Sequence, residues 1–274
     1  MVIKGIDAHA HVFKPGLKLA KVRRYAPEYE ASIEEFIAHF ESKGLDHGLL
    51  IQPSFLGTDN SFMVEAIRKN PDKLYGVAVV NPTVIEAGLD ELNQHNIIGI
   101  RLNLYGKEIP DLTRDEWKPL LQKIKALDWH VELHIDAVEL PALVEALLGY
   151  GVKVVVDHFG KPNPERLVND EGFQYLLRKA ETKQIWIKIS GTYRLNKSAG
   201  LQKSIKAAET LIKPLLATYG PERLLWGSDW PHTQFEDRMT YDKSYAIFQQ
   251  LVPDEQQRQC ILMDAFNQLL PGKV

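Results

Sequence analysis

The chain contains almost no cysteine, which restricts what can hold its fold together. Cys260 is the only cysteine among 274 residues, so neither an intrachain disulfide nor a cysteine-based zinc site can form. Apolar residues make up 45% of the chain and charged residues 25%, values close to those of ordinary globular proteins. We therefore expect a hydrophobic core of normal size to stabilise the chain without covalent cross-links.

Long apolar runs and a surplus of positive charge are also missing. No apolar run reaches the roughly 18 residues that would indicate a membrane-spanning helix. The chain has 33 basic and 36 acidic residues, a net charge of -3, and no basic stripe typical of a nucleic-acid partner. Its first residues enter a strand pattern without the features of a signal peptide. We expect a cytoplasmic protein, monomeric or homo-oligomeric, whose partner is a small molecule.

Short strand patterns alternate with longer amphipathic helical patterns along the chain. The predicted strands are Val2–His9, Gly48–Gln52, Leu74–Val80, Ile97–Leu102, Trp129–Ile135, Val152–Val156, Ile185–Ile189 and Leu224–Gly227. The predicted helices are Ile33–Lys43, Ser61–Asn70, Val84–Gln94, Arg114–Leu127, Val138–Leu148, Glu165–Thr182, Leu201–Tyr219, Tyr241–Leu251 and Asp254–Leu269. Ser32 and Asp254 are predicted N-caps, and Glu165 is a predicted helix start after Pro164.

Eight strands joined by helices predict right-handed crossovers and a parallel sheet. Eight is also the number that closes such a sheet into a single (β/α)8 TIM barrel, here spanning residues 1–274 with some distortion allowed. An open doubly wound sheet would usually place a glycine-rich phosphate turn after its first strand. The first strand of this chain instead ends in Asp7-Ala-His-Ala-His11, which favours the barrel.

Two histidines mark the end of that first strand. Side chains alternate across a strand, so His9 and His11 point the same way. Both lie at the carboxyl end, where barrel enzymes carry their active sites. Two imidazoles one pleat apart can chelate a metal ion or polarise a carbonyl group together. Such a pair alone is also found among surface and structural histidines.

Three other predicted strands end in the same kind of residue. His134 closes the fifth strand, His158 follows the sixth and Asp229 follows the eighth. By strand alternation, His158 shares a face with Val154 and Val156, which we expect to fill the barrel beneath it. Independent structural histidines would not readily gather at equivalent strand ends. We therefore predict one active site at the barrel mouth, built from these residues and the first-strand pair.

Imidazoles and a carboxylate suit a borderline divalent cation such as zinc. One alternative is a single ion held by His9, His11, His134 and Asp229. His158 would then serve as an acid, a base or a partner of the carbonyl group. In the other alternative no metal is required, and Asp229 stays free to deprotonate the attacking water.

Positive charge follows three of the predicted strands. Arg101, at the end of the fourth strand, would be costly in the mouth without an anionic partner, and its planar guanidinium group matches a carboxylate. Lys161 and Arg194 follow the sixth and seventh strands. They either attract an acidic substrate or form salt bridges among loops.

The loop after the second strand offers further hydrogen-bonding groups. Ser54 and Gln52 are candidates to contact a ligand oxygen. Asp59 and Asn60 are more typical of turn and helix-capping residues. His232 follows Asp229 closely and is a further candidate to line the site.

Five motifs, in order along nearly the whole chain, resemble the amidohydrolase superfamily (amidohydrolase-related family 2). The resemblance is to its lactonase branch, which includes the 2-pyrone-4,6-dicarboxylate hydrolases of aromatic compound catabolism. The matching motifs are Asp7–His11, Gln52–Asn60, Gly99–Asn103, Asp157–Gly160 and Gly227–Pro231. Only their combination is specific for the branch.

This resemblance implies hydrolysis of a lactone at the mouth of a deformed barrel. It implies that Asp229 is the general base for water, and that the lactone carbonyl is surrounded by His9, His11 and His158. Arg101 would hold a substrate carboxylate. Further substrate contacts would come from Ser54, Lys161, Arg194 and His134.

Two positions depart from the superfamily pattern. Members with two metal ions carry a bridging lysine or glutamate on the fourth strand, where this chain has Arg101, so no binuclear centre is expected. The pyrone-dicarboxylate hydrolases work without metal and have an aromatic hydroxyl on the fifth strand. In this chain His134 occupies that position and completes a possible set of ligands for one metal ion. The sequence therefore does not decide whether a metal ion is used.

Two other functions compete with a lactonase. A metal-dependent decarboxylase of the same superfamily would also use the His-x-His pair, a later histidine and the aspartate after the eighth strand. The decarboxylase would require its metal ion for activity. The Gly57–Asn60 loop favours the lactonase. A catalytically silent small-molecule binder is the other alternative. The gathering of polar residues at the mouth speaks against it.

Overall fold

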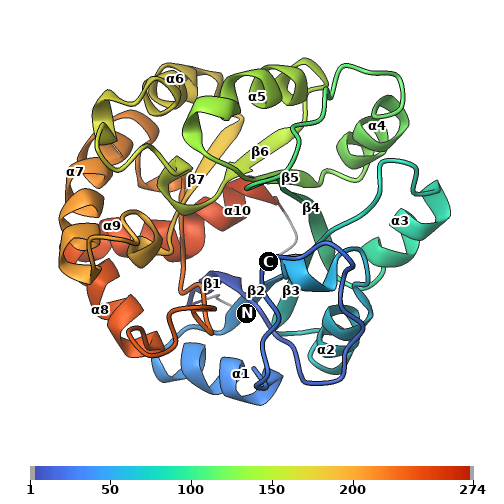
Figure 1. The fold of residues 1–274 in the computed structure, drawn as a ribbon, viewed down its shortest axis with the longest axis horizontal. Coiled ribbons are helices and arrows are strands. Elements are labelled where there is room, and N and C mark those ends of the chain that lie inside the picture. The colour runs from blue at the N-terminus through green and yellow to red at the C-terminus, as the bar shows by residue number, and fades with distance from the viewer. Residues whose placement is uncertain (1–3, 272–274) are drawn as a thin grey trace.

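Eight parallel strands form the centre of the computed structural model, which describes residues 4–271. Each strand is hydrogen-bonded to the next in chain order. The strands are β1 (Ile6–Ala10), β2 (His47–Ile51), β3 (Leu74–Ala78), β4 (Ile97–Asn103), β5 (His130–His134), β6 (Lys153–Val156), β7 (Ile185–Ser190) and β8 (Leu224–Gly227). Helices surround them (Figure 1). The predicted (β/α)8 TIM barrel is confirmed; the first residues of the predicted strand Val2–His9 lie outside the described part.

The helices of the outer ring fall close to the predicted ranges. They are α1 (Ile33–Ser42), α2 (Ser61–Lys69), α3 (Glu86–Asn93), α4 (Lys118–Ala126), α5 (Leu140–Gly149), α6 (Glu171–Lys179), α7 (Leu201–Tyr219) and α8 (Tyr241–Leu251). The predicted last helix is divided into α9 (Glu255–Gln259), a π-helical turn η8 (Cys260–Asp264) and α10 (Ala265–Leu269). Short 3₁₀ turns near the mouth are η1 (Ser54–Leu56), η3 (His158–Gly160) and η6 (Thr192–Arg194).

Local capping explains where several helices begin. Ser32 accepts a hydrogen bond from the backbone N–H of Glu35, and Asp254 caps α9, as predicted. The predicted helix start at Glu165 is wrong. Residues 165–166 form a turn and Leu167–Asn169 a single 3₁₀ turn. The helix α6 begins only at Glu171, because the Asp170 carboxylate accepts the first free backbone N–H groups of that helix.

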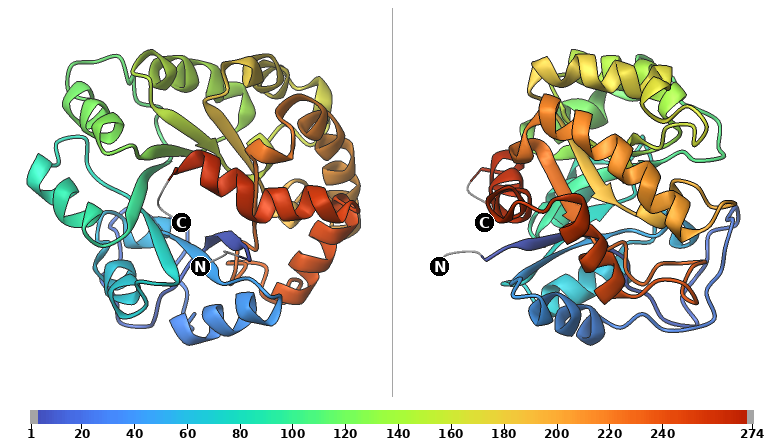
Figure 2. Two further views of the ribbon diagram at one scale, coloured as in Figure 1. Left: turned by 180° about the vertical axis from the view of Figure 1, so that it is seen from behind. Right: turned by 90° about the vertical axis from the view of Figure 1, so that its left-hand side faces the viewer.

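Two apolar layers lie on the two faces of the sheet. Inside the barrel, Val155 and Leu225 pack in one cluster with Phe266 of α10, which lies across the end of the barrel away from the mouth (Figure 2). Val154 and Val156 belong to the other cluster, with the helix residues. The expectation that they fill the barrel beneath His158 is therefore wrong. Asp157 points inward after Val155, and His158 reaches the mouth through a turn of the backbone.

The barrel closes at a seam between β1 and the residues that follow β8. The Asp229 N–H donates to the carbonyl oxygen of His9, and the His11 N–H donates to that of Trp230, both at 2.8 Å. Residues 10 and 230 form a single bridge there in place of a regular ladder. The seam therefore joins the two segments that carry the predicted catalytic residues.

Long loops extend from the mouth end of the barrel. The loops after β1 and β8 lie at the same end in the side view (Figure 2). The loop between β1 and α1 contributes Arg24 and Tyr25 to the pocket there. Within residues 4–271, no helix is both long enough and apolar enough to cross a membrane.

Substitution of Gly227 tests how tightly the seam is packed. A Cβ atom added at Gly227 would lie 2.4 Å from His9 Cβ and 2.7 Å from the His9 backbone nitrogen. Gly227→Ala should therefore lower the free energy of unfolding by about 1–3 kcal/mol, because β1 would have to move. Gly149→Ala is the matched control, since nothing lies within 4 Å of its added Cβ. Equal unfolding midpoints of these two variants in denaturant would contradict tight packing at the seam.

Candidate active site

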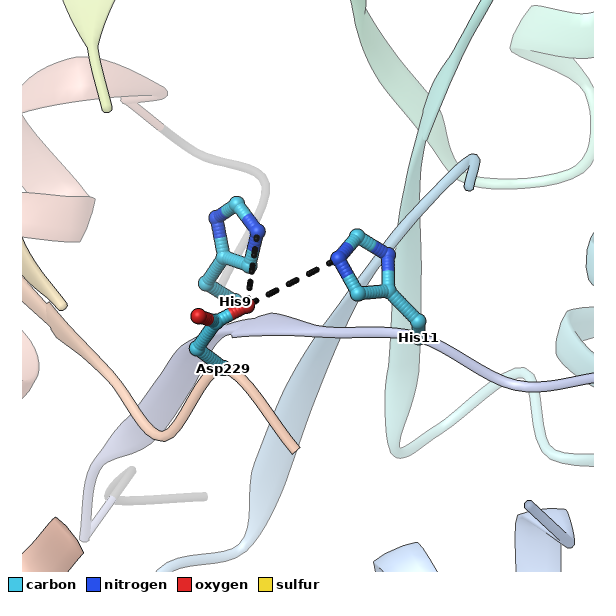
Figure 3. Close-up of side chains that lie close together, drawn as sticks. All are labelled: His9, His11 and Asp229. Atoms are coloured by element: carbon cyan, nitrogen blue, oxygen red, sulfur yellow. Dashed lines mark ion pairs between the residues drawn. The ribbon is translucent and has the colours of Figure 1, made fainter. Parts of the chain in front are cut away.

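The predicted polar residues meet at the carboxyl ends of the strands. One pocket, with an empty volume of about 760 Å³ including its open mouth, is lined by His11, His134, His158 and Asp229. His9 is fully buried directly beneath it, in contact with the same group. The ligand atoms of His9, His11 and Asp229 all lie within 4.8 Å of one another (Figure 3). Four strand ends therefore supply one site.

Asp229 is held by one of its two carboxylate oxygens. Its Oδ2 accepts hydrogen bonds from the Tyr193 hydroxyl at 2.7 Å and from Arg194 Nε at 2.6 Å. Its Oδ1 has no hydrogen-bond partner among the described residues and lies 3.8 Å from Nε2 of both His9 and His11. The carboxylate is thus oriented by one oxygen and offers the other to a ligand.

The charge of Asp229 is fixed by the same neighbours. Burial raises the pKa of this carboxyl, but the positive charge of Arg194 beside it outweighs burial and holds the pKa well below its usual value. Asp229 is therefore ionised at neutral pH. Its backbone φ of 60° lies in the left-handed region, which is uncommon for a residue with a side chain.

A backbone carbonyl group determines which ring nitrogen of His11 carries the hydrogen. His11 Nδ1 lies 2.7 Å from the carbonyl oxygen of Ile51, which can only accept a hydrogen bond. The hydrogen is therefore on Nδ1, and Nε2 carries a lone pair that faces Asp229. Burial, with the positive charge of Arg101, lowers the pKa of His11 to about 4, so the ring is neutral.

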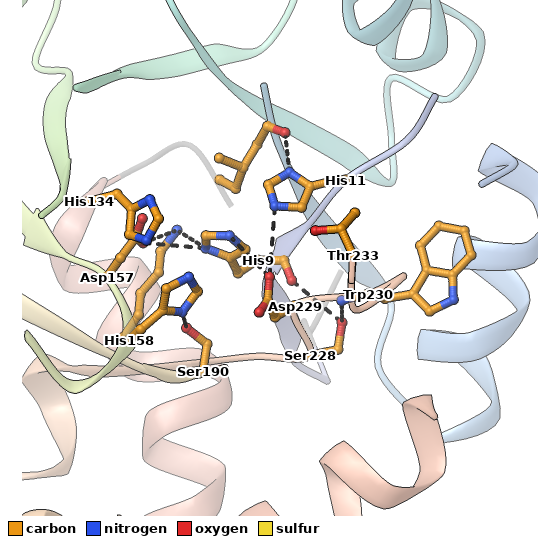
Figure 4. Close-up of polar contacts among 12 residues, drawn as sticks. His9, His11, His134, Asp157, His158, Ser190, Ser228, Asp229, Trp230 and Thr233 are labelled. Carbon is orange, nitrogen blue, oxygen red and sulfur yellow. Dashed lines mark hydrogen bonds and ion pairs between the residues drawn. The ribbon is translucent and has the colours of Figure 1, made fainter. Parts of the chain in front are cut away.

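His158 enters the site through a tight turn of the chain. Its φ is 52°, and its Nδ1 lies 2.9 Å from the Ser190 hydroxyl (Figure 4). Gly191 lies against it with a φ of 57°, and a Cβ there would come within 2.7 Å of His158 Nδ1 and 3.0 Å of Asp229 Oδ2. This position needs glycine both for its backbone conformation and for space. Burial lowers the pKa of His158 to about 4.

His134 lies on the far side of His158 from the seam. Its ring is 5.2 Å from that of His158 and stacks on Tyr105 at 5.8 Å. Its Nδ1 donates to Asn103 Oδ1 at 3.2 Å. Within the described chain, the residue groups with metal-binding geometry do not include His134. The predicted four-ligand set is thus not gathered around one point in this arrangement.

Arg101 is part of a buried charge cluster under the pocket. Its Nε and one Nη donate to Asp157 Oδ2 at 3.0 and 2.6 Å, and its Nε lies 3.3 Å from Glu132. The fourth member is Lys188, whose Nζ contacts Glu132 Oε2 at 2.5 Å. Arg101 also lines the pocket. Its predicted contact with a substrate carboxylate remains a prediction.

The two other predicted cations have different neighbours. Arg194 holds Asp229, as described above. Lys161 Nζ lies 3.3 Å from Asp136 and 3.3 Å from the centre of the Tyr105 ring. Burial lowers the pKa of the Lys161 ammonium group to about 8. Both side chains also line the pocket, so each contacts a protein group and faces the space for a ligand.

Of the residues predicted in the loop after β2, one lines the pocket and others stabilise the loop itself. Ser54 lines the pocket. Gln52 Nε2 donates to the backbone carbonyl of Asp59 at 2.7 Å, and Asn60 Nδ2 donates to that of Val79 at 2.9 Å. These two amides hold the loop in place. His232 is buried against Tyr193 and is not among the pocket-lining residues in the described chain.

Sequence reasoning missed several residues of the site. Arg24, Tyr105 and Lys197 come from irregular loops, which give no periodic signal. Lys188 and Ser190 could have been found, because strand alternation in Ile185–Ser190 places both on the face opposite the isoleucines. The full set of cations lining the pocket is Arg24, Arg101, Lys161, Arg194 and Lys197. Asp229 is its only carboxylate within the described residues, so the pocket favours anions.

The donor atoms fit a divalent cation at some positions and not at others. The described residues contain two groups that could hold an ion: one is His9, His11 and Asp229, and the other is His9, Asp157 and His158. His11 suits a ligand role, because its N–H bonds a carbonyl while Nε2 remains free. His9, common to both groups, is less suited to a ligand role. The ammonium group of Lys188 lies 3.3 Å from its Nδ1 and can only donate a hydrogen bond, so it occupies the lone pair of that nitrogen.

Comparison with known proteins shows which family the chain resembles over nearly its whole length. A family model described as amidohydrolase matches residues 6–265. A 2-pyrone-4,6-dicarboxylate hydrolase of Comamonas testosteroni is 31% identical over 268 residues, which cover 94% of this chain and 87% of the relative.

Two crystal structures are similar in both fold and sequence. One is a protein of Pseudomonas putida described as a 2-pyrone-4,6-dicarboxylic acid hydrolase. It is 42% identical with a TM-score of 0.91, and 98% of each chain is covered. The other, from Acinetobacter baumannii, is described in the same way and has citric acid bound. It is 39% identical with a TM-score of 0.92, covering 97% of this chain and 99% of the other.

Removal of Asp157 tests the buried charge cluster. Asp157→Asn leaves the guanidinium group of Arg101 without its main counter-charge in a dry environment. The free energy of unfolding should fall by about 3 kcal/mol, as measured by denaturant titration at pH 7. The control is Glu65→Gln, which removes the exposed ion pair with Lys69 and should leave the midpoint unchanged. An Asp157→Asn midpoint as high as that of the control would show that the cluster does not depend on this charge.

Proposed function

Because the chain belongs to the amidohydrolase family, we propose that it hydrolyses a small carboxylated lactone, either 2-pyrone-4,6-dicarboxylate or a related acidic or sugar lactone. It is an enzyme acting on a cyclic ester, and its relatives at 31–42% identity favour this over a decarboxylase. The observation that carries the proposal is the free Oδ1 of Asp229, which lies between two imidazoles at the pocket floor.

Asp229 is proposed as the general base. A water molecule at Oδ1 would lie next to the lactone carbonyl carbon, with the Tyr193 and Arg194 contacts keeping the carboxylate aligned. As the water oxygen bonds to that carbon, its proton passes to Asp229 and the carbonyl electron pair moves onto oxygen. Positioning these groups before the reaction removes much of the entropic cost of attack.

The imidazoles and cations would stabilise the charge that develops on the carbonyl oxygen. Preorganised N–H donors in a water-poor site are the largest contribution in many acyl-transfer enzymes. His9 and His158 lie beside Asp229 and are proposed for this task. The tetrahedral intermediate then loses its ring oxygen, which takes the proton back from Asp229, either directly or relayed through His158. The products are the released hydroxyl or enol group and a new carboxylic acid, which loses its proton to water.

The excess of positive charge around the pocket supports an acidic substrate. Arg101 is proposed to hold a substrate carboxylate, with Ser54, Lys161 and His134 as further contacts. Arg194 is proposed mainly to orient Asp229. The relative that binds citric acid, a tricarboxylic acid, has a closely similar fold. A neutral sugar lactone would make no use of this positive charge and is the weaker choice.

A single divalent ion, with zinc favoured by the ligand types, is the alternative composition of the site. His11 Nε2 and Asp229 Oδ1 would hold it. When bound, such an ion supplies Lewis-acid polarisation of the carbonyl group. The proposed proton transfers use only side chains of the chain itself.

Asp229→Asn should abolish most turnover and leave binding largely intact. Loss of the general base is expected to lower kcat by roughly 10²–10⁴-fold with little change in KM. The measurement is ring opening across a panel of acidic and sugar lactones, with and without chelator. Asp242→Asn, at an exposed ion pair with Lys43, is the control and should retain full activity. Near-normal turnover in Asp229→Asn would remove this residue from the mechanism, and failure of wild type on every lactone would reject the function.

The ammonium group of Lys161 should make substrate binding depend on alkaline pH. With a pKa of about 8, it loses its positive charge as the pH rises through that value. KM for an anionic lactone should therefore rise by about tenfold between pH 7 and pH 9, while kcat changes little. Lys161→Arg stays charged and should keep KM low at pH 9. A flat wild-type KM across this range would show that Lys161 does not bind the substrate's charge.

A further inference from the structure

Lys188 is a lysine with no exposure to solvent, in the middle of β7. Its Nζ lies 2.5 Å from Glu132 Oε2, 3.3 Å from His9 Nδ1 and 3.9 Å from Asp157 Oδ1. The side chain is therefore in the barrel interior, directly beneath the pocket floor. The hydrolytic steps described above make no use of it.

The charged groups nearest to Lys188 are carboxylates. The buried cluster contains two cations, Lys188 and Arg101, and two carboxylates, Glu132 and Asp157. Two carboxylates thus face two cations in a dry site, where a buried charge without a partner would be very costly. Burial, with the charge of Asp157, raises the pKa of Glu132 to about 8, and the adjacent Lys188 and Arg101 oppose that rise. A lysine ammonium group has three hydrogen-bond donors and no acceptor. Any hydrogen bond between Lys188 and His9 must therefore be donated by Lys188.

Two groups compete for His9 Nδ1, and their requirements are opposite. Asp157 Oδ1, at 3.4 Å, would need a hydrogen on Nδ1, whereas the Lys188 ammonium group needs a lone pair there. Only the Lys188 contact has hydrogen-bond geometry, and Asp157 Oδ1 has no hydrogen-bond partner in the described part of the chain. An ammonium group that donates to Nδ1 leaves that nitrogen without a hydrogen. The ring is therefore neutral with one hydrogen.

We propose that Lys188 is a positioning residue that keeps the hydrogen of His9 on Nε2, so that His9 presents an N–H group to the pocket floor. Figure 4 shows the His9 ring between Asp157 on one side and Asp229 on the other. Nε2 lies 3.8 Å from Asp229 Oδ1 and has no hydrogen-bond partner among the described residues. The inference deepens the proposed function, since this N–H is the donor offered to the lactone oxygen.

His9 and His11 then have opposite chemistry although they share a strand face. Nε2 of His9 carries a hydrogen and donates, whereas Nε2 of His11 carries a lone pair and accepts. A donor suits the oxygen of a carbonyl group, and an acceptor suits a water molecule. The same hydrogen on His9 Nε2 blocks metal binding through that atom, because a metal ligand must offer a lone pair. Lys188 therefore also lowers the affinity of the site for zinc.

The tautomer can be observed without substrate. In long-range ¹H–¹⁵N spectra of protein labelled at histidine, the protonated and unprotonated nitrogens of a neutral imidazole resonate at well-separated frequencies. His9 is assigned by comparison with His9→Gln. We expect wild-type His9 to show its hydrogen on Nε2 and His11 to show it on Nδ1. A hydrogen on Nδ1 of His9 in the wild type would overturn the proposal.

Substitution of Lys188 should reverse the tautomer. In Lys188→Met, His9 is free to donate from Nδ1 to Asp157, and zinc should bind about tenfold more tightly, measured by competition with a chromophoric chelator. Lys188→Arg retains a cationic donor and should keep both wild-type properties. Lys69→Met removes an exposed lysine and should change neither.

A balanced variant covers the case in which Lys188→Met does not fold. Lys188→Met combined with Glu132→Gln removes one charge of each sign and should show the same reversal. An unchanged tautomer and zinc affinity in whichever of these variants folds would refute the role of Lys188. Both measurements are independent of turnover. A correct tautomer in a protein that opens no lactone would therefore reject the function and leave the inference about Lys188 standing.

Discussion

Asp229 and His9 are linked through their backbones as well as through their side chains. The hydrogen bond from the Asp229 N–H to the His9 carbonyl closes the barrel, and it also sets the distance between the carboxylate and the first histidine. A (β/α)8 sheet needs such a closure to bury its inner face. Here the closing segment contains the residues that are proposed to be catalytic. The geometry of the site is therefore maintained by the stability of the whole barrel.

Below this seam the barrel interior contains charge where apolar side chains usually lie. Lys188, Arg101, Glu132 and Asp157 form a closed set in which each charge has an opposite neighbour. Burial of this set costs desolvation energy that an apolar core would not require. In return, His9 above the cluster has a defined electrostatic environment and a defined hydrogen-bond partner in Lys188. The cluster therefore lowers stability but orients one imidazole ring of the site.

Periodicity was sufficient to predict the barrel and the strand ends that form the site. It worked because strand alternation and strand ends are local properties, visible in motifs such as Asp7–His11. It failed where backbone turns redirect side chains. His158 reaches the pocket through a left-handed residue, although Val156 before it faces the helices. The start of α6 was misplaced because Asp170 and not Pro164 determines the first helical turn.

Side-chain partners could be predicted less well than positions. Arg194 was expected over the mouth, and it is there, but its contact with Asp229 Oδ2 depends on a turn in η6 that no pattern reveals. The neighbouring Tyr193 was not predicted as a site residue for the same reason. The buried pair of Lys188 and Glu132 brings together residues 56 positions apart. Such pairings follow from the closure of the barrel and from no local signal.

The charge of the pocket has a consequence for the end of the catalytic cycle. Ring opening converts an ester into a carboxylate, so the product carries one more negative charge than the substrate. Five cations and one carboxylate line the pocket within the described chain, and they attract the product more strongly than the lactone it came from. These attractions slow the departure of the product, and dissolved salt, which screens them, should accelerate it.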